Sequence, residues 1–374
     1  MSITETAAKT ILRRHKRIDS WFASRYGMNL YRGCLHNCAY CDGRAEKYDV
    51  RGEFGQDVEV KTNAPEVLSR ELDPAKKRKP LKRGYVFLGG GVNDAYQPVE
   101  KKYQLTRQVL EILYKYDFPV HILTKSTLVK RDLDLILALN ARSRVIVSMS
   151  FSSVNDEISA IFEPGVPPPS ERLETLKFFR EKGLACGMYL MPVIPYFTDK
   201  PDEIDNSLRS AVKAGLDFVI FGGMTLKYGR QRDHYYRVLR QHAPALLHEY
   251  NIIYPGDPYG QATPAYYQSL HELFYTLLKQ YKIPCRIPSY LYNDIVDEND
   301  RVVLMLDHLD YFYKLEGKAS PFGYAAHMLS QVKEPFSSLS GSVENIRGVG
   351  KKTAYLVAEI LKTRKLSLLK QYNL

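Results

Sequence analysis

The sequence has no long apolar run. No uninterrupted stretch of its 374 residues approaches the roughly 20 apolar residues that span a bilayer. The first six residues, from Met1 to Thr6, also lack the apolar segment of a secretory signal peptide. These absences predict a cytoplasmic protein with no membrane partner. The chain also contains no internal repeat and no low-complexity tract, so we expect an ordinary globular protein.

Cysteine is scarce, but its distribution is uneven. Of the five cysteines, Cys34, Cys38 and Cys41 fall within eight positions. In a reducing cytoplasm, an odd and crowded trio indicates metal binding rather than disulfide bonds. A structural zinc ion needs four ligands, and His36 could complete a Cys3His set. A [4Fe–4S] cluster on three thiolates would instead leave one iron open to a substrate or cofactor.

Negative charge is also in deficit. The chain has 42 Asp and Glu against 53 Lys and Arg, which gives a formal net charge of +11. The basic residues are dense at 13–17 and 76–83, and we expect residues 1–27 to form a basic arm and 76–83 a surface loop. Such an excess favours a polyanionic partner, most simply nucleic acid, although a generally basic soluble enzyme would show it too.

Short apolar runs alternate with amphipathic segments from residue 28 onward. The pattern predicts strands at 28–31, 84–88, 119–124, 144–151, 184–191 and 217–222, and helices near 100–116, 127–139, 170–182 and 201–214. Repeated strand–helix units imply parallel strands with right-handed crossovers. Six units are fewer than the eight of a closed TIM barrel. The predicted fold class is therefore α/β, a partial (β/α)6 TIM-like barrel with a small all-helical C-terminal appendage.

Three further segments complete the predicted domain organisation. The barrel with its flanking helices occupies 28–290, a helical linker follows at 291–336, and 337–374 forms a separate C-terminal motif. In such barrels, active residues lie at the carboxyl ends of the strands. The cysteines follow directly after the predicted strand 28–31, so we expect them on the catalytic face.

The spacing Cys-x3-Cys-x2-Cys, with an aromatic residue before the last cysteine, resembles the signature of the radical S-adenosylmethionine enzymes. This resemblance implies a [4Fe–4S] cluster on Cys34, Cys38 and Cys41, with S-adenosylmethionine on the open iron and Tyr40 beside its adenine. One electron would cleave S-adenosylmethionine, and the resulting 5′-deoxyadenosyl radical would abstract a hydrogen from the substrate. It also implies an electron donor such as flavodoxin or ferredoxin.

The wider context resembles the branch related to spore photoproduct lyase, over roughly residues 5–290. The matching stretches are Asn29–Cys41, Asn93–Glu100, Leu123–Ser126, Arg131–Asp132, Glu163–Pro164 and Arg172–Leu173. One feature departs from that branch, because the lyase has a hydrogen-donating cysteine near the second-strand loop and residues 89–96 contain none. Cys186 is then a candidate catalytic thiol, although it and Cys285 would serve equally as inert core residues.

Glycines and a lysine follow two predicted strands. Gly89, Gly90 and Gly91 resemble the family's second-strand motif, which contacts the methionine end of the cofactor, and they would let the backbone approach a ligand closely. A strand-ending turn would also explain them. Lys125 ends the third strand and could neutralise a cofactor carboxylate or a substrate phosphate, or be a solvated loop residue. Asp94 is a further catalytic candidate, although a role in bracing loops suits it better.

Two later strands supply further candidates for cofactor binding. The period of two places Ser148 and Ser150 on one face of strand 144–151, toward the barrel interior. There they could bind the cofactor's ribose, as the family's fourth strand does, or be satisfied structural serines. Met191 on the fifth strand could pack against adenine, although methionines on a buried strand are commonly core residues.

The C-terminal stretch 342–361 resembles a helix-hairpin-helix DNA-binding motif. Gly348 and Gly350 would permit a tight hairpin, and the following helix would direct its N-terminus, Lys351 and Lys352 at one DNA phosphate. A plain helical hairpin, or one that binds protein, is the alternative. Residues 228–240 interleave arginines with tyrosines, which would suit phosphates and exposed bases, or form a solvated basic helix.

These observations predict a radical S-adenosylmethionine enzyme that acts on a nucleic-acid base, in DNA more than in RNA, by lesion repair or base modification. The first alternative is the same chemistry on a peptide or small molecule, with the hairpin as a protein-binding element. The second is a non-enzymatic, metal-containing protein that binds nucleic acid.

Overall fold

The structure is a computed structural model that describes residues 2–76, 80–91, 93–339 and 343–374. Residues 77–79 of the predicted basic loop lie outside this description. So do residues 340–342, which belong to the predicted C-terminal motif.

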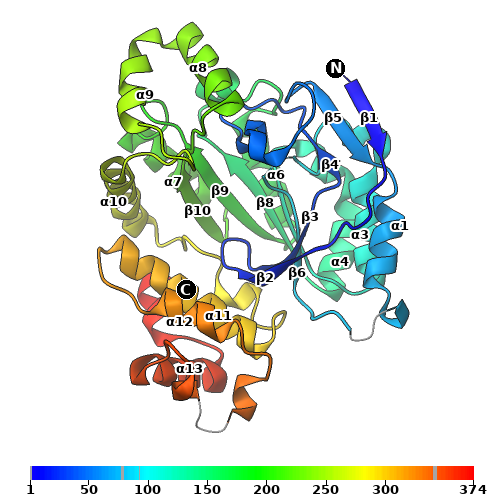
Figure 1. Ribbon diagram of the computed structural model, residues 1–374, viewed down its shortest axis with the longest axis vertical. Coiled ribbons are helices and arrows are strands. Elements are labelled where there is room, and N and C mark those ends of the chain that lie inside the picture. The colour runs from blue at the N-terminus through cyan, green and yellow to red at the C-terminus, as the bar shows by residue number, and fades with distance from the viewer. Residues whose placement is uncertain (1, 77–79, 92, 340–342) are drawn as a thin grey trace.

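A curled seven-stranded sheet forms the centre of the molecule (Figure 1). Its strands, in spatial order, are β10 (Phe218–Gly223), β9 (Ala185–Val193), β8 (Val145–Phe151), β7 (Val120–Thr124), β6 (Tyr85–Leu88), β3 (Ser24–Met28) and β2 (Arg13–Asp19). The six from β3 to β10 are parallel, and β2 is antiparallel to β3. This arrangement confirms the predicted partial (β/α)6 barrel.

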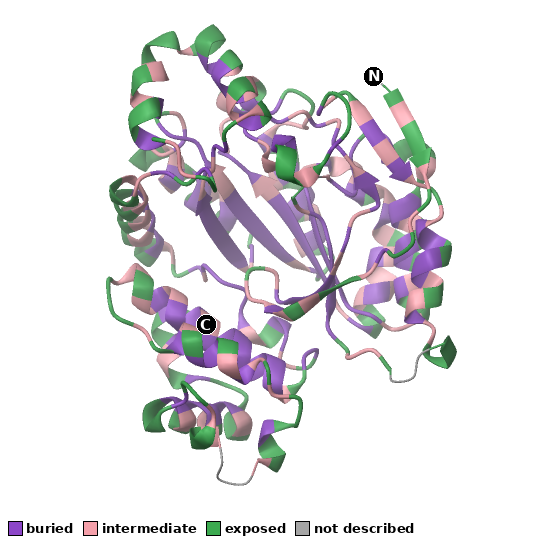
Figure 2. Ribbon diagram, in the orientation of Figure 1, coloured by how far each residue is buried: buried purple, intermediate pink, exposed green. Residues whose placement is uncertain are grey.

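Helices cover the outer face of this sheet. They are α3 (Leu105–Lys115), α4 (Leu133–Arg142), α6 (Pro169–Glu181) and α7 (Pro201–Lys213), and α1 (Ala64–Leu72) packs against α3. The short helices α2 (Glu100–Tyr103) and α5 (Asp156–Phe162) precede α3 and α6 in the chain. Figure 2 shows the six parallel strands almost wholly buried and the outer helix faces exposed. Strands buried on both faces read as continuous apolar runs, which is why the sequence located five of the six parallel strands closely.

The first barrel strand lies earlier than the sequence predicted. The prediction was 28–31, whereas β3 spans Ser24–Met28, and Tyr31–Arg32 form the short strand β4 in a second sheet of order β1-β5-β4. The other strands of that sheet are β1 (Ser2–Thr6) and β5 (Asp57–Lys61). Strand β3 contains Arg25, which does not read as core, but its guanidinium lies 3.2 Å from the Asp300 carboxylate of a distant helix.

Residues 2–27, the described part of the predicted basic arm 1–27, are therefore not a free arm, contrary to the prediction. They contribute β1 to the small sheet and β2 and β3 to the large one. Strand β2 is the edge of the large sheet, and its Arg13, Arg14 and Lys16 are exposed. Charged side chains on an edge strand oppose pairing with another chain, so the basic run has a structural reason.

Two groups of helices follow the barrel at its opposite ends (Figure 1). The helices α8 (Arg230–His242) and α9 (Leu247–Ile253) lie at the carboxyl ends of the strands, and α10 (Pro264–Tyr281) packs against α7. The helices α11 (Glu298–Leu315), α12 (Phe322–Leu329) and α13 (Lys351–Thr363) lie at the amino ends. There the Tyr85 hydroxyl donates to the Leu291 carbonyl, and the Arg144 guanidinium donates to the Tyr290 carbonyl.

The last 84 residues do not divide into a linker and a separate motif as predicted. The helices α11, α12 and α13 and the 3-10 helix Ser367–Tyr372 share one apolar core, in which the rings of Phe312 and Tyr372 stack with centroids 3.9 Å apart. We call the described residues of 291–374 the C-terminal helical unit. Its boundary with the barrel is set by long-range packing, which local sequence patterns do not report.

The predicted helix-hairpin-helix is not confirmed. Helix α13 begins at Lys351 after Gly350, as predicted, but the described residues of the motif before it, 343–350, form only the 3-10 turn Val343–Asn345 instead of a first helix. Gly348 has φ +82°, and a Cβ atom there would lie 2.6 Å from the Tyr324 ring. Gly350 has an ordinary extended conformation with φ −84°. Only Gly348 therefore needs to be glycine.

No helix within the described residues is long and apolar enough to cross a membrane.

Candidate functional site

A cavity of about 400 Å³ opens at the carboxyl ends of the parallel strands. The predicted site residues that line it are Cys34, Cys38, Cys41, Tyr40, Gly90, Gly91, Asp94, Lys125, Ser150 and Met191. They come from the cysteine loop and from the ends of β6, β7, β8 and β9. The barrel topology thus brings together residues that are up to 157 positions apart, from Cys34 to Met191.

The cysteine loop presents three thiols that are mostly withdrawn from solvent. Cys34 and Cys38 are buried, and Cys41 is half-buried. Burial raises the pKa of all three thiols, that of Cys38 to about 12. They are therefore neutral without a metal, and a metal that binds them must displace their protons. At the start of the loop Gly33 has φ +86°, and a Cβ atom there would lie 2.5 Å from the Asp57 carbonyl oxygen.

A buried carboxylate joins the cysteine loop to the barrel. Glu163, just after α5, accepts a hydrogen bond from the Tyr40 hydroxyl and lies 2.9 Å from the Lys125 ammonium. Its second oxygen lies 2.6 Å from the Arg172 guanidinium. Burial alone would raise the pKa of Glu163, but Arg172 and Lys125 outweigh it and hold that pKa below its ordinary range. Tyr40 and Lys125 thus have fixed positions on the cavity wall.

Asp94 braces two loops. One carboxylate oxygen accepts from the Thr124 hydroxyl at 2.6 Å and the Tyr96 amide at 2.8 Å, and the other accepts from the Lys125 amide at 2.7 Å. His36 also faces it, with Nδ1 3.4 Å from Oδ2. With this many partners, Asp94 acts as an anchor for the loops after β6 and β7.

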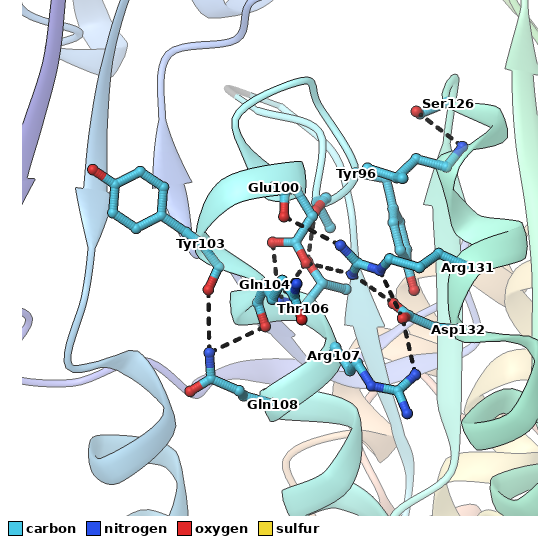
Figure 3. Close-up of polar contacts among 12 residues, drawn as sticks. Tyr96, Glu100, Tyr103, Gln104, Thr106, Arg107, Gln108, Ser126, Arg131 and Asp132 are labelled. Carbon is cyan, nitrogen blue, oxygen red and sulfur yellow. Dashed lines mark hydrogen bonds and ion pairs between the residues drawn. The ribbon is translucent and has the colours of Figure 1, made fainter.

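A second buried carboxylate, that of Glu100, anchors the loop after β6 (Figure 3). Glu100 accepts from the Thr106 amide, at 3.1 Å, and from the Tyr31 hydroxyl. Its Oε1 lies 2.7 Å from the Arg131 guanidinium, which also bonds to Asp132. The loop after β6 therefore rests on a network of buried charges.

Three predicted residues do not line the cavity. Gly89 packs the end of β6 against β7, since a Cβ atom there would lie 2.5 Å from the Leu123 carbonyl oxygen. Ser148 is fully buried, and its hydroxyl lies 2.9 Å from His121 Nε2 inside the barrel. The strand period predicted the correct face for Ser148 but not its depth below the cavity.

Cys186 is the third such residue, and here the prediction of a catalytic thiol is wrong. It is completely buried and does not line the cavity. Side chains alternate along a strand, so Cys186 lies on the opposite face of β9 from Met191, which does line the cavity. Burial raises the pKa of its thiol. The chain therefore places no cysteine other than the loop trio at this site.

Several cavity residues were not predicted. They are Asp42, Asn93, Leu123, Thr124, Pro192, Gly223, Met224 and Thr225, and His36, which was considered only as a zinc ligand, also lines the cavity. The position of a residue at the carboxyl end of a predicted strand could have indicated some of them, such as Gly223, which ends the sixth barrel strand. Asn93 lines this wall, and its side-chain nitrogen is buried without a hydrogen-bond partner.

Comparisons with known proteins identify the fold and its signature. The sequence profile of the Radical SAM superfamily matches residues 28–206. An uncharacterized protein of Mycobacterium tuberculosis is 33% identical over 263 residues, which cover 69% of this chain and 75% of that protein. The chain belongs to the radical SAM superfamily. An uncharacterized protein of Methanocaldococcus jannaschii is 32% identical over 57% of this chain and 75% of its own length.

Solved structures of spore photoproduct lyase share the fold of this radical SAM chain. A point mutant has a TM-score of 0.53 with 16% identity, covering 75% of this chain and 79% of its own. A variant with bound AdoMet and dinucleoside spore photoproduct has a TM-score of 0.52, also with 16% identity, covering 75% and 78%. At this identity the likeness shows the fold alone.

Superfamily membership implies a [4Fe–4S] cluster and S-adenosylmethionine, and the residues present fit both. Three thiols on one cavity wall match three irons of a cubane and leave the fourth open. Asn93, whose side-chain nitrogen has no hydrogen-bond partner, lines the same cavity. The zinc alternative fits less well because His36 faces Asp94. Moreover, no group of three or more His, Cys, Asp or Glu within the described ranges is arranged to hold a single metal ion, whereas the thiols of a cubane bind separate irons.

Proposed function

We propose that this radical SAM protein is an enzyme that binds a [4Fe–4S] cluster through Cys34, Cys38 and Cys41 and acts on a base in nucleic acid, most simply DNA. The observation that carries the enzymatic part is the single cavity that contains all three thiols together with Tyr40 and Lys125. When bound, the cluster would supply the electron that cleaves S-adenosylmethionine and so generates a hydrogen-abstracting radical. A protein reductant of the flavodoxin or ferredoxin class would supply that electron.

The residues around the cavity have distinct roles in this proposal. Gly90 and Gly91 have φ +92° and +60° and leave the backbone open to the methionine end of the cofactor. Tyr40 and Met191 provide apolar walls for adenine, and Lys125 provides a positive charge for a carboxylate. The buried walls exclude water, which protects a radical from side reactions.

The surface beside the cavity supports a polyanionic substrate. Helix α8 lies at this end of the barrel and exposes Arg230, Arg237 and Arg240 on one side. Tyr228, immediately before it, is 57% exposed and suits stacking on a base. Tyr235 and Tyr236 do not, because both are buried. The sequence pattern had suggested all three tyrosines, but helix α8 turns two of them into the core.

The C-terminal helical unit lies at the opposite end of the barrel from the cavity (Figure 1). Strand β8 has seven residues, so the strand alone separates the two ends by roughly 20 Å. We therefore propose that the unit, through Lys351 and Lys352, contacts nucleic acid remote from the reacting base. The Lys352 ammonium lies 5.8 Å from the centre of the Phe322 ring, which leaves Lys351 as the freer cation.

The test is anaerobic turnover of the cluster-loaded protein with S-adenosylmethionine and either damaged or undamaged DNA. We expect 5′-deoxyadenosine together with a changed nucleoside, both measured by mass spectrometry and both dependent on damaged DNA. No 5′-deoxyadenosine under any of these conditions would contradict the enzymatic proposal. Formation of 5′-deoxyadenosine that DNA and RNA never stimulate would contradict the nucleic-acid substrate and favour a peptide or small molecule.

A further inference from the structure

Two buried glutamines hold the two ends of the cysteine loop. Gln97, in the loop after β6, donates from Nε2 to the Gly33 carbonyl at 3.0 Å and accepts from the Leu35 amide at 2.9 Å. Its single side chain therefore bridges the residues on either side of Cys34. Gln97 is fully buried, so water cannot replace these two hydrogen bonds.

Gln231 holds the other end of the loop from helix α8. Its Nε2 donates to the Tyr40 carbonyl at 2.8 Å and to the Thr225 carbonyl at 2.9 Å. Its oxygen accepts from the Lys227 amide at 2.9 Å. Gln231 is also fully buried, and it ties the residue before Cys41 to the segment that leaves β10.

An ion pair completes the second clamp. The Lys227 ammonium lies 2.6 Å from the Asp42 carboxylate, and the Thr225 hydroxyl donates to the same oxygen at 2.7 Å. Asp42 directly follows Cys41, so the residues on both sides of that cysteine are held by the segment 225–231. The middle cysteine has a different support, because its neighbour Ala39 donates its amide to the Phe162 carbonyl at 2.8 Å.

We propose that Gln97 and Gln231 are positioning residues that separately set Cys34 and Cys41, so that the three thiols are in place before any cluster binds. That these thiols are cluster ligands rests on the proposed function, but their preorganisation does not. A short loop without regular secondary structure would otherwise sample many conformations, and ordering each residue has an entropic cost of about 1–2 kcal/mol. Gln97 lies in the loop after β6 and Gln231 at the start of α8, which follows β10. These are the segments after the second and sixth barrel strands, so a folded barrel is needed to order the loop.

The experiment compares Gln97→Leu and Gln231→Leu in cluster-free protein prepared under anaerobic conditions. Iodoacetamide alkylation is followed at each cysteine by mass spectrometry of peptides. Gln97→Leu removes two hydrogen bonds and Gln231→Leu removes at least three, so each should raise the population of locally opened protein roughly tenfold or more. Gln97→Leu should therefore accelerate Cys34 at least fivefold and leave Cys41 within twofold, and Gln231→Leu should do the reverse.

Each variant is the matched control for the other, and buried Cys186 is an internal reference whose rate should not change. If a leucine variant does not fold, Gln97→Glu and Gln231→Glu take its place, because glutamate keeps the acceptor and loses the donor. Equal acceleration of all three loop cysteines, or none, would overturn the proposal. Iron content after reconstitution of the wild-type protein tests the cluster assignment independently, so the two failures can be distinguished.

Discussion

The Lys125 ammonium lies 2.9 Å from the Glu163 carboxylate and 5.6 Å from the centre of the Tyr40 ring. Lys125 follows β7 and Glu163 follows α5, so this contact joins two strand–helix units at the cavity wall. The lysine is therefore neither a free surface charge nor an isolated buried one. It has a fixed place from which it can share its charge with a ligand carboxylate.

Lys125→Met should weaken the binding of S-adenosylmethionine about tenfold or more. The variant lacks the ammonium group that would donate a hydrogen bond to the charged carboxylate of the cofactor. Equilibrium dialysis on cluster-loaded protein measures the affinity, and iron content shows whether the cluster is retained. Lys130→Met is the control, since Lys130 is an exposed lysine on the following 3-10 turn. Equal affinities of the Lys125→Met and Lys130→Met proteins for S-adenosylmethionine would show that Lys125 does not bind the cofactor.

Glu163→Gln should destabilise the protein by about 3 kcal/mol at pH 7, because it leaves the buried Arg172 without its counter-charge. The pKa of Glu163 is lowered in the folded state, so its contribution is complete above the unfolded pKa of about 4.3 and is lost as pH falls further. Urea unfolding of both proteins from pH 7 to pH 3.5 should show the difference shrinking below about pH 4.3. A difference that stays constant with pH would contradict the pKa assignment.

Replacing Cys34, Cys38 or Cys41 singly with alanine should abolish a stable cluster. The wild-type protein should bind about four irons and four sulfides per chain after anaerobic reconstitution, as one cubane requires. Cys186→Ala and Cys285→Ala should bind the same amount, because both thiols are buried away from the cavity. Stoichiometric zinc without iron in an anaerobic preparation would refute the cluster.

The proposed nucleic-acid surfaces can be separated by two matched double variants. Arg237→Gln with Arg240→Gln removes two charges beside the cavity, and Lys351→Gln with Lys352→Gln removes two from the C-terminal helical unit. Each should weaken DNA binding at all sequences and lower the salt-dependence slope by about 0.9 for each DNA phosphate that the variant no longer neutralises. Filter binding at several salt concentrations measures both. If the lysine pair has no effect, the C-terminal unit is not a DNA interface.

Deletion of the C-terminal motif is a poor substitute for these variants. The stretch 337–374 includes Tyr372, which stacks on Phe312 of α11, so its removal would expose an apolar helix face. Gly348 is equally unsuitable, because any side chain there would meet the Tyr324 ring. Gly350→Ala is the neutral control, since no atom lies within 4 Å of its added Cβ.

The sequence by itself determined the cysteine trio, five of the six parallel strands of the barrel and about half of the residues that line the cavity at their carboxyl ends. These follow from local patterns: ligand spacing, apolar runs that mark buried strands, and the rule that loops after parallel strands meet at one face. Cys34 was predicted from the ligand spacing and Tyr40 from the resemblance to the radical S-adenosylmethionine enzymes, whereas Lys125 was predicted from its position at the end of a strand. The loop glycines Gly90 and Gly91 were predicted in the same way.

Only the tertiary structure decided which residues hold the cysteine loop and which predicted site residues do not line the cavity. Gln97 and Gln231 bond to backbone atoms 64 and 191 positions away, and no local pattern marks such a contact. Ser148 was misplaced because strand periodicity gives a face but not a depth. Cys186 was misplaced because it lies on the opposite face of β9 from the cavity residue Met191. The C-terminal unit was divided wrongly, and its position far from the cavity was not foreseen. Both depend on how distant apolar surfaces pack, which is a property of the whole chain.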